Sequence, residues 1–183
     1  GDHVADTDVV RAKYNCPVVG ASADAHRLPR LDQAVKEGDT VKLGNASARV
    51  IETPGHTRGQ INFFFADGGV LLSGDTLFSL GCGRLIEGTP QEMFESLAKL
   101  KALPGDTLIC CGHEYTESNA KFALHIDPAN PALKAMSDKV AALRSAGKPS
   151  VPSVMADELK ANPFLTATTV AAFAERRAGK DKF

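Results

Sequence analysis

Short apolar runs bounded by glycine, proline and polar turns fill the first two thirds of the chain. Residues 17–21 predict a short strand, and residues 36–55 predict two strands that a Gly-Asn turn joins. Residues 61–75 (INFFFADGGVLLSGD) contain an apolar run, an Asp-Gly-Gly turn and a second apolar run, which indicates a hairpin. Residues 106–111 (DTLICC) predict one more buried strand.

A helical pattern interrupts these strands at residues 89–103. Thr89 and Glu92 have the spacing of a capping box, and a proline follows Thr89 at the first helical position. The apolar residues of this stretch share one face of a helix: Met93, Phe94, Leu97 and Leu100. We therefore expect an amphipathic helix between the hairpin and the strand at 106–111.

The pattern changes after Tyr115, and no further strand is predicted. Helices are expected at about 117–125, from residue 131 onward with one apolar face, and at about 168–177. Mixed strands followed by helices indicate an α/β layered fold. We place the boundary between a first domain, 1–115, and a helical C-terminal domain, 116–183.

Composition narrows the classes of function. The 183 residues carry a formal net charge of −1 with interspersed charges, which argues against nucleic acid as a partner and favours a small molecule. No apolar run reaches the roughly 18 residues that span a bilayer, and no signal-peptide pattern is present, so we expect a cytoplasmic protein without membrane contact. The four cysteines lack a C-x-x-C spacing, so neither a disulfide framework nor a zinc knuckle is indicated. We expect a monomer.

Three predicted strands are each followed by a glycine and a metal-binding side chain: His56, Asp75 and His113. Loops at one edge of an α/β sheet are where such folds place their sites, and imidazole with carboxylate suits zinc, iron or manganese. Taken singly, each histidine could be an ordinary turn residue and Asp75 could cap a turn. The threefold repetition of the pattern favours a shared metal site.

These motifs resemble a known family. The order of TPGHTRGQ, GDTLF and CGHEYT is similar to the metallo-β-lactamase superfamily. Within it, the chain resembles glyoxalase II, the hydroxyacylglutathione hydrolases, in four stretches: GCGRLIEGTPQEM, CGHEYTESNAKFA, VPSVMADELKANPF and the closing RAGKDKF. The resemblance implies a metallo-β-lactamase-like αββα sandwich, with its N-terminal strands missing from these 183 residues, followed by a helical substrate-binding domain.

Asp2 and His3 resemble the last two letters of the superfamily signature H-x-H-x-D-H. We therefore expect the chain to be a fragment, a cleavage product or an incomplete sequence. The resemblance implies that one divalent cation is held by Asp2, His3, Asp75 and His113, and a second by the two leading histidines with His56 and Asp75. Because the second set keeps only two of its four ligands, we expect one metal ion or fewer in this piece, against two in the intact enzyme, with zinc ahead of iron or manganese.

The resemblance also implies the reaction. Glyoxalase II hydrolyses the thioester S-D-lactoylglutathione to glutathione and D-lactate in methylglyoxal detoxification, and Asp2 and Asp75 would hold the attacking hydroxide between the cations. The residues implied to bind glutathione are Arg84, Tyr115, Arg177 and Lys180. Ile86 stands where the family often has a tyrosine, which removes one contact.

Two alternatives stay open. Another superfamily enzyme, such as a persulfide dioxygenase or a lactonase, would share the metal ligands, although these enzymes generally lack the helical R-x-x-K tail. The piece could also be an inactive fragment that keeps glutathione binding without a complete metal pair. For the 183-residue chain itself we expect negligible turnover.

Overall fold

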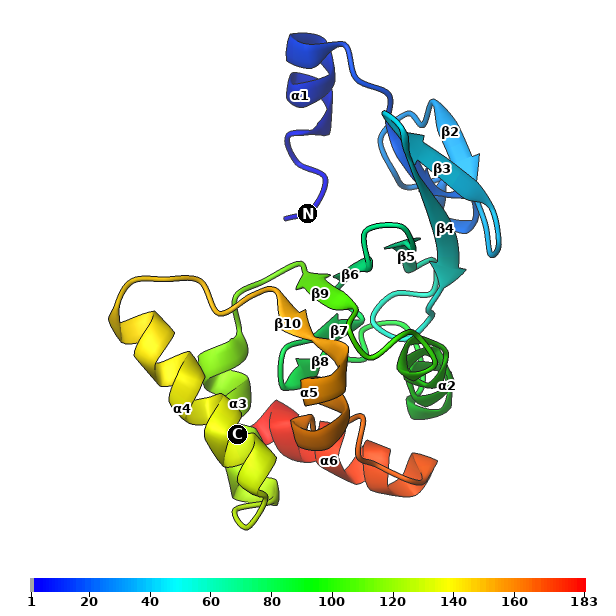
Figure 1. Cartoon of the computed structure of the whole chain (residues 1–183). Coiled ribbons are helices and arrows are strands. Elements are labelled where there is room, and N and C mark those ends of the chain that lie inside the picture. Colours follow the sequence, from blue (N-terminus) through cyan, green and yellow to red (C-terminus); the bar gives the residue numbers. More distant parts are fainter. Residues whose placement is uncertain (1) are drawn as a thin grey trace.

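A six-stranded mixed sheet forms the centre of the protein, which the computed structural model describes over residues 2–183 (Figure 1). The helices are α1 (Thr7–Tyr14), α2 (Pro90–Lys101), α3 (Thr116–Ile126), α4 (Pro131–Ser145), α5 (Met155–Ala161) and α6 (Val170–Lys182), with a 3-10 turn η1 at Ser22–Asp24. The strands are β1 (Val19–Ala21), β2 (Gln33–Val35), β3 (Thr40–Leu43), β4 (Ala46–Glu52), β5 (Ile61–Phe65), β6 (Val70–Gly74), β7 (Leu77–Phe78), β8 (Gly81–Cys82), β9 (Leu108–Cys111) and β10 (Ser153–Val154).

The order of strands in the main sheet is β10-β9-β6-β5-β4-β3. Because β5 is antiparallel to both β4 and β6, those two strands run in the same direction, and β9 is parallel to β6. The strands β4, β6 and β9 therefore end at the same edge of the sheet. Two small sheets, β1 with β2 and β7 with β8, complete the strand content.

The α/β class, the two hairpins and the strand after the helix are confirmed, but of the four residues of that strand only Ile109 is buried. The two predicted strands at 36–55 are β3 and β4, and the apolar runs at 61–75 are β5 and β6. The strand predicted at 106–111 is β9, which begins two residues later than expected. These elements were predictable because their hairpin turns and apolar runs are local features of the sequence.

Helix α2 is also confirmed, with both hydrogen bonds of the capping box between Thr89 and Glu92. Its apolar face packs on the sheet, where Met93, Leu97 and Leu100 join the main hydrophobic cluster. Figure 1 shows α2 beside the sheet, on the side away from α3 and α4.

The prediction of no strand after Tyr115 is wrong. The two-residue strand β10 pairs with β9 in antiparallel fashion, with Ser153 opposite Ile109, and helix α5 follows it directly. A strand this short carries no alternating pattern, and its pairing depends on a partner far away in the sequence. Helices α3 and α4 are where the sequence predicts them, and α6 continues to Lys182.

The helices after β9 lie together at the lower end of the molecule, whereas α1 lies at the opposite end (Figure 1). Phe122, Phe164 and Phe173 join the main core, which extends from the sheet into this helical region. The division at 115/116 stays a prediction, since β10 belongs to the main sheet. Within residues 2–183, no helix has the length and apolar character needed to cross a bilayer.

Candidate functional site

The loops that follow β4, β6 and β9 bring three side chains together at one edge of the sheet. The Nε2 atoms of His56 and His113 both lie 3.4 Å from Oδ2 of Asp75. Asp75 is buried, with 7% of its surface exposed, at the end of β6. The meeting of these loops follows from the shared direction of the three strands.

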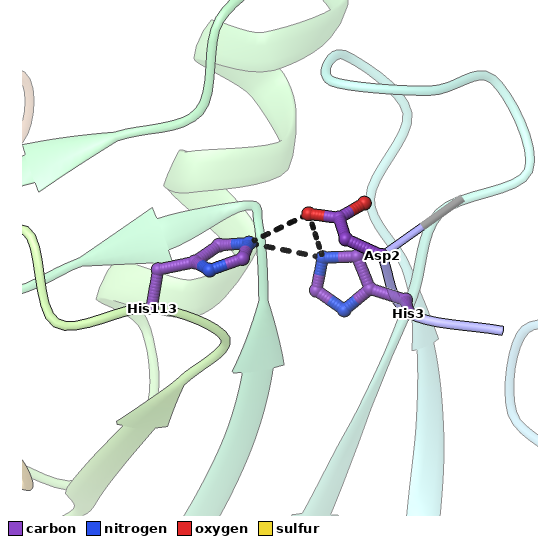
Figure 2. Close-up of side chains that lie close together, drawn as sticks. All are labelled: Asp2, His3 and His113. Carbon is purple, nitrogen blue, oxygen red and sulfur yellow. Dashed lines mark hydrogen bonds and ion pairs between the residues drawn. The ribbon is translucent and has the colours of Figure 1, made fainter. Parts of the chain in front are cut away.

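Asp2 and His3, near the N-terminus, join this cluster, and Figure 2 shows them beside His113. His3 Nε2 lies 3.2 Å from Asp75 Oδ2 and 3.2 Å from His113 Nε2. Asp2 Oδ2 lies 3.4 Å from His113 Nε2 and 3.9 Å from His3 Nε2. The ligand atoms of Asp2, His3 and His113 all lie within 4.8 Å of one another.

Two glycines allow this close approach. Gly74 adopts a φ of 48°, a left-handed conformation that glycine accepts without strain, and so turns the chain between β6 and Asp75. A Cβ atom on Gly112 would lie 2.4 Å from Asp75 Oδ1 and 3.0 Å from His3 Cε1. A side chain at residue 112 would therefore push two of the clustered residues apart.

The donor atoms fit a divalent cation. His56 Nδ1 lies 2.9 Å from the carbonyl oxygen of Arg84, which can only accept, so this nitrogen carries the hydrogen and Nε2 presents a lone pair. That lone pair faces the Asp75 carboxylate, whose buried Oδ1 has no hydrogen-bond partner within residues 2–183. Ligands placed about 2.0–2.2 Å from a tetrahedral zinc lie roughly 3.3–3.6 Å apart, close to most of the spacings of this cluster.

A pocket of about 520 Å³ opens beside the cluster. Its wall includes His56, Asp75 and His113, together with the four residues expected to bind substrate: Arg84, Tyr115, Arg177 and Lys180. Tyr115 is half exposed and stacks on His113, with the ring centroids 4.8 Å apart. Ile86 also lines this pocket and is 61% exposed.

The two cationic side chains of α6 that line the pocket, Lys180 and Arg177, differ in their surroundings. Lys180 Nζ donates to the carbonyl oxygen and to Oγ of Ser118, both at 3.0 Å, and burial together with the nearby Arg177 lowers the pKa of the lysine. Arg177 is only 5% exposed. Its guanidinium donates to the carbonyl oxygen of Cys82 at 2.7 Å and to Asp181 Oδ1 at 3.0 Å. Both of its terminal nitrogens thus already have partners in the protein.

Sequence reasoning missed several residues of the pocket wall, among them the polar residues Ser118, Asn119 and Asp181. The i, i+4 spacing of Arg177 and Asp181 on a predicted helix is a signal that could have identified their ion pair. Asn119 carried no such signal, because its bond to the carbonyl oxygen of Ser79 joins two distant segments.

Comparison with known families decides which family this site belongs to. A family model described as the metallo-beta-lactamase superfamily matches residues 1–113, and one described as the hydroxyacylglutathione hydrolase C-terminus matches residues 114–183. A hydroxyacylglutathione hydrolase from Rhodospirillum rubrum is 50% identical over 196 residues, covering 100% of this chain and 77% of the relative. The chain belongs to the hydroxyacylglutathione hydrolase family.

Other relatives agree with this assignment. A hydroxyacylglutathione hydrolase from Cereibacter sphaeroides is 50% identical and also covers 100% of this chain and 77% of the relative. One from Acidiphilium cryptum is 51% identical over 182 residues. The recognition of glyoxalase II from its motifs is thus confirmed.

Solved structures show the fold. The crystal structure of ETHE1 from Myxococcus xanthus has a TM-score of 0.68 at 24% identity and covers 97% of this chain and 64% of that one. The BLEG-1 B3 metallo-beta-lactamase has a TM-score of 0.65 at 23% identity, covering 91% and 73%. The metallo-beta-lactamase fold expected from the motifs is confirmed.

Proposed function

We propose that this chain carries the site of a metal-dependent hydrolase of glutathione thioesters, with S-D-lactoylglutathione as substrate and glutathione and D-lactate as products. The observation that carries the proposal is the convergence of three histidines on the Asp75 carboxylate, in the wall of a pocket that also presents cationic side chains. The match of residues 114–183 to the family's C-terminal model supports this reaction over a persulfide dioxygenase or a lactonase.

The residues of the cluster divide into two ligand sets. Asp2, His3, Asp75 and His113 supply four donors for one divalent cation, and His56 with the shared Asp75 supplies two donors for another. Cations bound there would lower the pKa of a water molecule and polarise the thioester carbonyl. We propose zinc as the metal, with iron and manganese as alternatives, since imidazole and carboxylate ligands accept all three.

The chain's own residues orient the substrate. Glutathione carries carboxylates, and exposed Arg84 together with Lys180 presents positive charge in the pocket wall. The ring of Tyr115 lies over His113 and offers a phenolic hydroxyl beside the metal ligands. Arg177 adds positive charge at the pocket floor, where Asp181 already shares its guanidinium. The acyl end then lies toward Asp75 and the glycine end toward α6.

The test compares two proteins: the 183-residue chain, and the same chain joined to the N-terminal segment of the Rhodospirillum rubrum relative. Metal per chain is measured by mass spectrometry, and thiol release is measured with S-D-lactoylglutathione as substrate. We expect about one metal or fewer and negligible turnover for the short chain, because the cluster within residues 2–183 supplies one complete set of four donors. The extended chain should hold two metals and release thiol, and its Asp75→Asn variant should lose both.

Either of two results would contradict these expectations. An extended chain that holds two metals but releases no thiol would contradict thioester hydrolysis and favour a binding protein. Full turnover by the short chain would contradict the ligand count. His26→Ala is the control for general effects of removing a histidine, since His26 is exposed and lies outside the pocket wall. The monomeric state and the cytoplasmic location stay predictions.

A further inference from the structure

A short hairpin connects the metal cluster to the substrate side of the pocket. It consists of β7, β8 and the turn between them, residues 77–82, and we refer to it as the site hairpin. Asp75 precedes it and Arg84 follows it. Phe78 from this hairpin makes an edge contact with Tyr115, with ring centroids 5.4 Å apart. A shift of the hairpin would therefore move groups on both sides of the pocket.

Side chains from the C-terminal helical region bind the backbone of the site hairpin. Glu158 Oε2 accepts a hydrogen bond from the Leu80 amide at 2.8 Å. Asn162 Nδ2 donates to the carbonyl oxygens of Phe78 at 3.2 Å and Gly81 at 3.1 Å. These bonds join residues that are 78 to 84 positions apart in the sequence.

The turn of the hairpin needs such partners. Leu80 has a φ of 55°, a left-handed conformation that is uncommon for a residue with a side chain. Asn119 adds a further bond, from its Nδ2 to the carbonyl oxygen of Ser79 at 3.0 Å. Three side chains thus hold the tip of the hairpin: Asn119 from α3, Glu158 from α5, and Asn162, which directly follows α5.

Glu158 is an unexpected residue for this position, because it is fully buried. Burial raises the pKa of its carboxyl group, and the groups that oppose this shift are amides and hydroxyls rather than cations. Its Oε2 also lies 3.0 Å from Asn162 Nδ2, whose two hydrogens are shared among this oxygen and the carbonyl oxygens of Phe78 and Gly81, so the two side chains form one unit. Burying a carboxyl group is costly unless it is hydrogen-bonded, and here the bonds to the hairpin and to Asn162 satisfy Oε2 alone, because the buried Oε1 has no hydrogen-bond partner within residues 2–183.

We propose that Glu158 and Asn162 are positioning residues for the glutathione end of the site. They hold the tip of the site hairpin in place. This keeps the ring of Phe78 against that of Tyr115, and it fixes the position of the backbone that leads from the hairpin to Arg84. The bond from Arg177 to the carbonyl oxygen of Cys82 holds the last residue of the same hairpin. The part of this proposal that concerns glutathione rests on the proposed function, whereas the clamp on the hairpin does not.

The experiment compares Glu158→Ala and Glu158→Gln with the wild-type chain, and uses Asp157→Asn as a control. Asp157 is the exposed neighbour of Glu158 on α5. Amide hydrogen exchange is followed over residues 77–84, and the affinity for S-methylglutathione is measured by calorimetry. In Glu158→Ala we expect exchange at Leu80 to be on the order of tenfold to a hundredfold faster, because a buried bond to an acidic group is lost. The same variant should bind S-methylglutathione at least about tenfold more weakly.

Glu158→Gln keeps an acceptor oxygen at the same place, so its exchange and affinity should stay near the wild-type values. A glutamine variant that behaves like the alanine variant would contradict the acceptor role. Exchange that is unchanged at residues 77–84, or that rises equally in β9, would contradict the clamp. Should Glu158→Ala fail to fold, Asn119→Ala removes only the bond to Ser79 and must still accelerate exchange at the hairpin tip.

The two proposals fail in different ways. If the wild-type chain does not bind S-methylglutathione, the proposed function and the glutathione part of this inference are contradicted, while the exchange data still decide the clamp. If the wild-type chain binds it and the loosened hairpin of Glu158→Ala binds it equally well, only the positioning role is overturned.

Discussion

The backbone of Gly112 passes so close to Asp75 that a Cβ atom at residue 112 would lie 2.4 Å from Asp75 Oδ1. Gly112 also donates its amide hydrogen to the carbonyl oxygen of Gly74 at 2.9 Å, so the ends of β9 and β6 are tied together. The distance between the loops that carry His113 and Asp75 is thus set by backbone contact. A methyl group at residue 112 has no free space.

Gly112→Ala should therefore disturb metal binding more than folding. The added methyl group would push the Asp75 carboxylate and the His3 ring away from His113, while the core packing of β9 stays intact. We expect at least about a tenfold loss of zinc affinity, since even residues that only orient metal ligands have effects of this size. Competition with a chelating dye measures it.

Gly68→Ala is the matched control, because a Cβ atom there would meet only Val70 Cγ2 at 3.8 Å. It should leave zinc affinity unchanged. Equal zinc affinity in Gly112→Ala and the wild-type chain would show that the cluster does not bind the metal.

The lowered pKa of Lys180 leads to a prediction of how ligand affinity depends on pH. Burial and the nearby Arg177 lower the pKa of this lysine below its ordinary value of 10.5. Because only the protonated ammonium attracts a carboxylate, affinity for S-methylglutathione should fall as the pH rises through this lowered pKa. In Lys180→Arg the charge persists, so the fall attributable to residue 180 should disappear.

Calorimetry at several alkaline pH values measures this difference. The ionisation of glutathione itself is common to both proteins and cancels in the comparison. Lys182→Arg is the control, because Lys182 is exposed and does not line the pocket. Parallel pH profiles for the wild-type and Lys180→Arg proteins would exclude Lys180 as the group that binds the carboxylate.

The capping box of α2 should make the stability of the folded protein depend on pH. Hydrogen bonds from the hydroxyl and the amide of Thr89 lower the pKa of Glu92 below 4.5. A lowered folded-state pKa means that the stabilisation is complete above 4.5 and is lost as the pH falls through the lowered value. Glu92→Gln should therefore lower Tm at neutral pH by no more than about 2 °C, and the difference should vanish in acid.

Thermal unfolding at a series of pH values tests this expectation. Glu117→Gln serves as the control, since Glu117 also lies in the first turn of a helix, α3, but within residues 2–183 it forms an exposed pair with Lys121 and no capping bond. A stability difference for Glu92→Gln that stays constant down to strongly acid pH would show that the carboxylate charge contributes nothing to the cap.

The elements that the sequence predicted share a local signal. The hairpin of β5 and β6 has its Asp-Gly-Gly turn, and α2 has its capping box and apolar stripe. The elements that it missed include the three-residue strand β2, the two-residue strands β7, β8 and β10, and the short helix α5. Strands this short cannot display an alternating pattern. β7 and β8 pair with each other across a tight turn, whereas β10 depends on the distant strand β9.

The residue types of the site could be predicted from the sequence, but the distances between their side chains could not. A glycine before His56, Asp75 and His113 marked the three loops, and the family motifs added Asp2 and His3. The bond from Arg177 to the carbonyl oxygen of Cys82 was hidden, because Cys82 belongs to the distant strand β8, whereas Asp181 lies one turn further along the same helix α6.

The sequence by itself determined the local elements, the chemistry of the metal-binding side chains and the membership of the hydrolase family, because apolar periodicity, turn residues and motifs all lie within short stretches of chain. Only the tertiary structure decided that three histidines, His3, His56 and His113, meet around one oxygen of Asp75, and that Glu158 and Asn162 hold the site hairpin. Such contacts depend on the order and direction of strands in the sheet and on which helix covers which edge. Those relationships join residues too far apart in the chain for any local pattern to record.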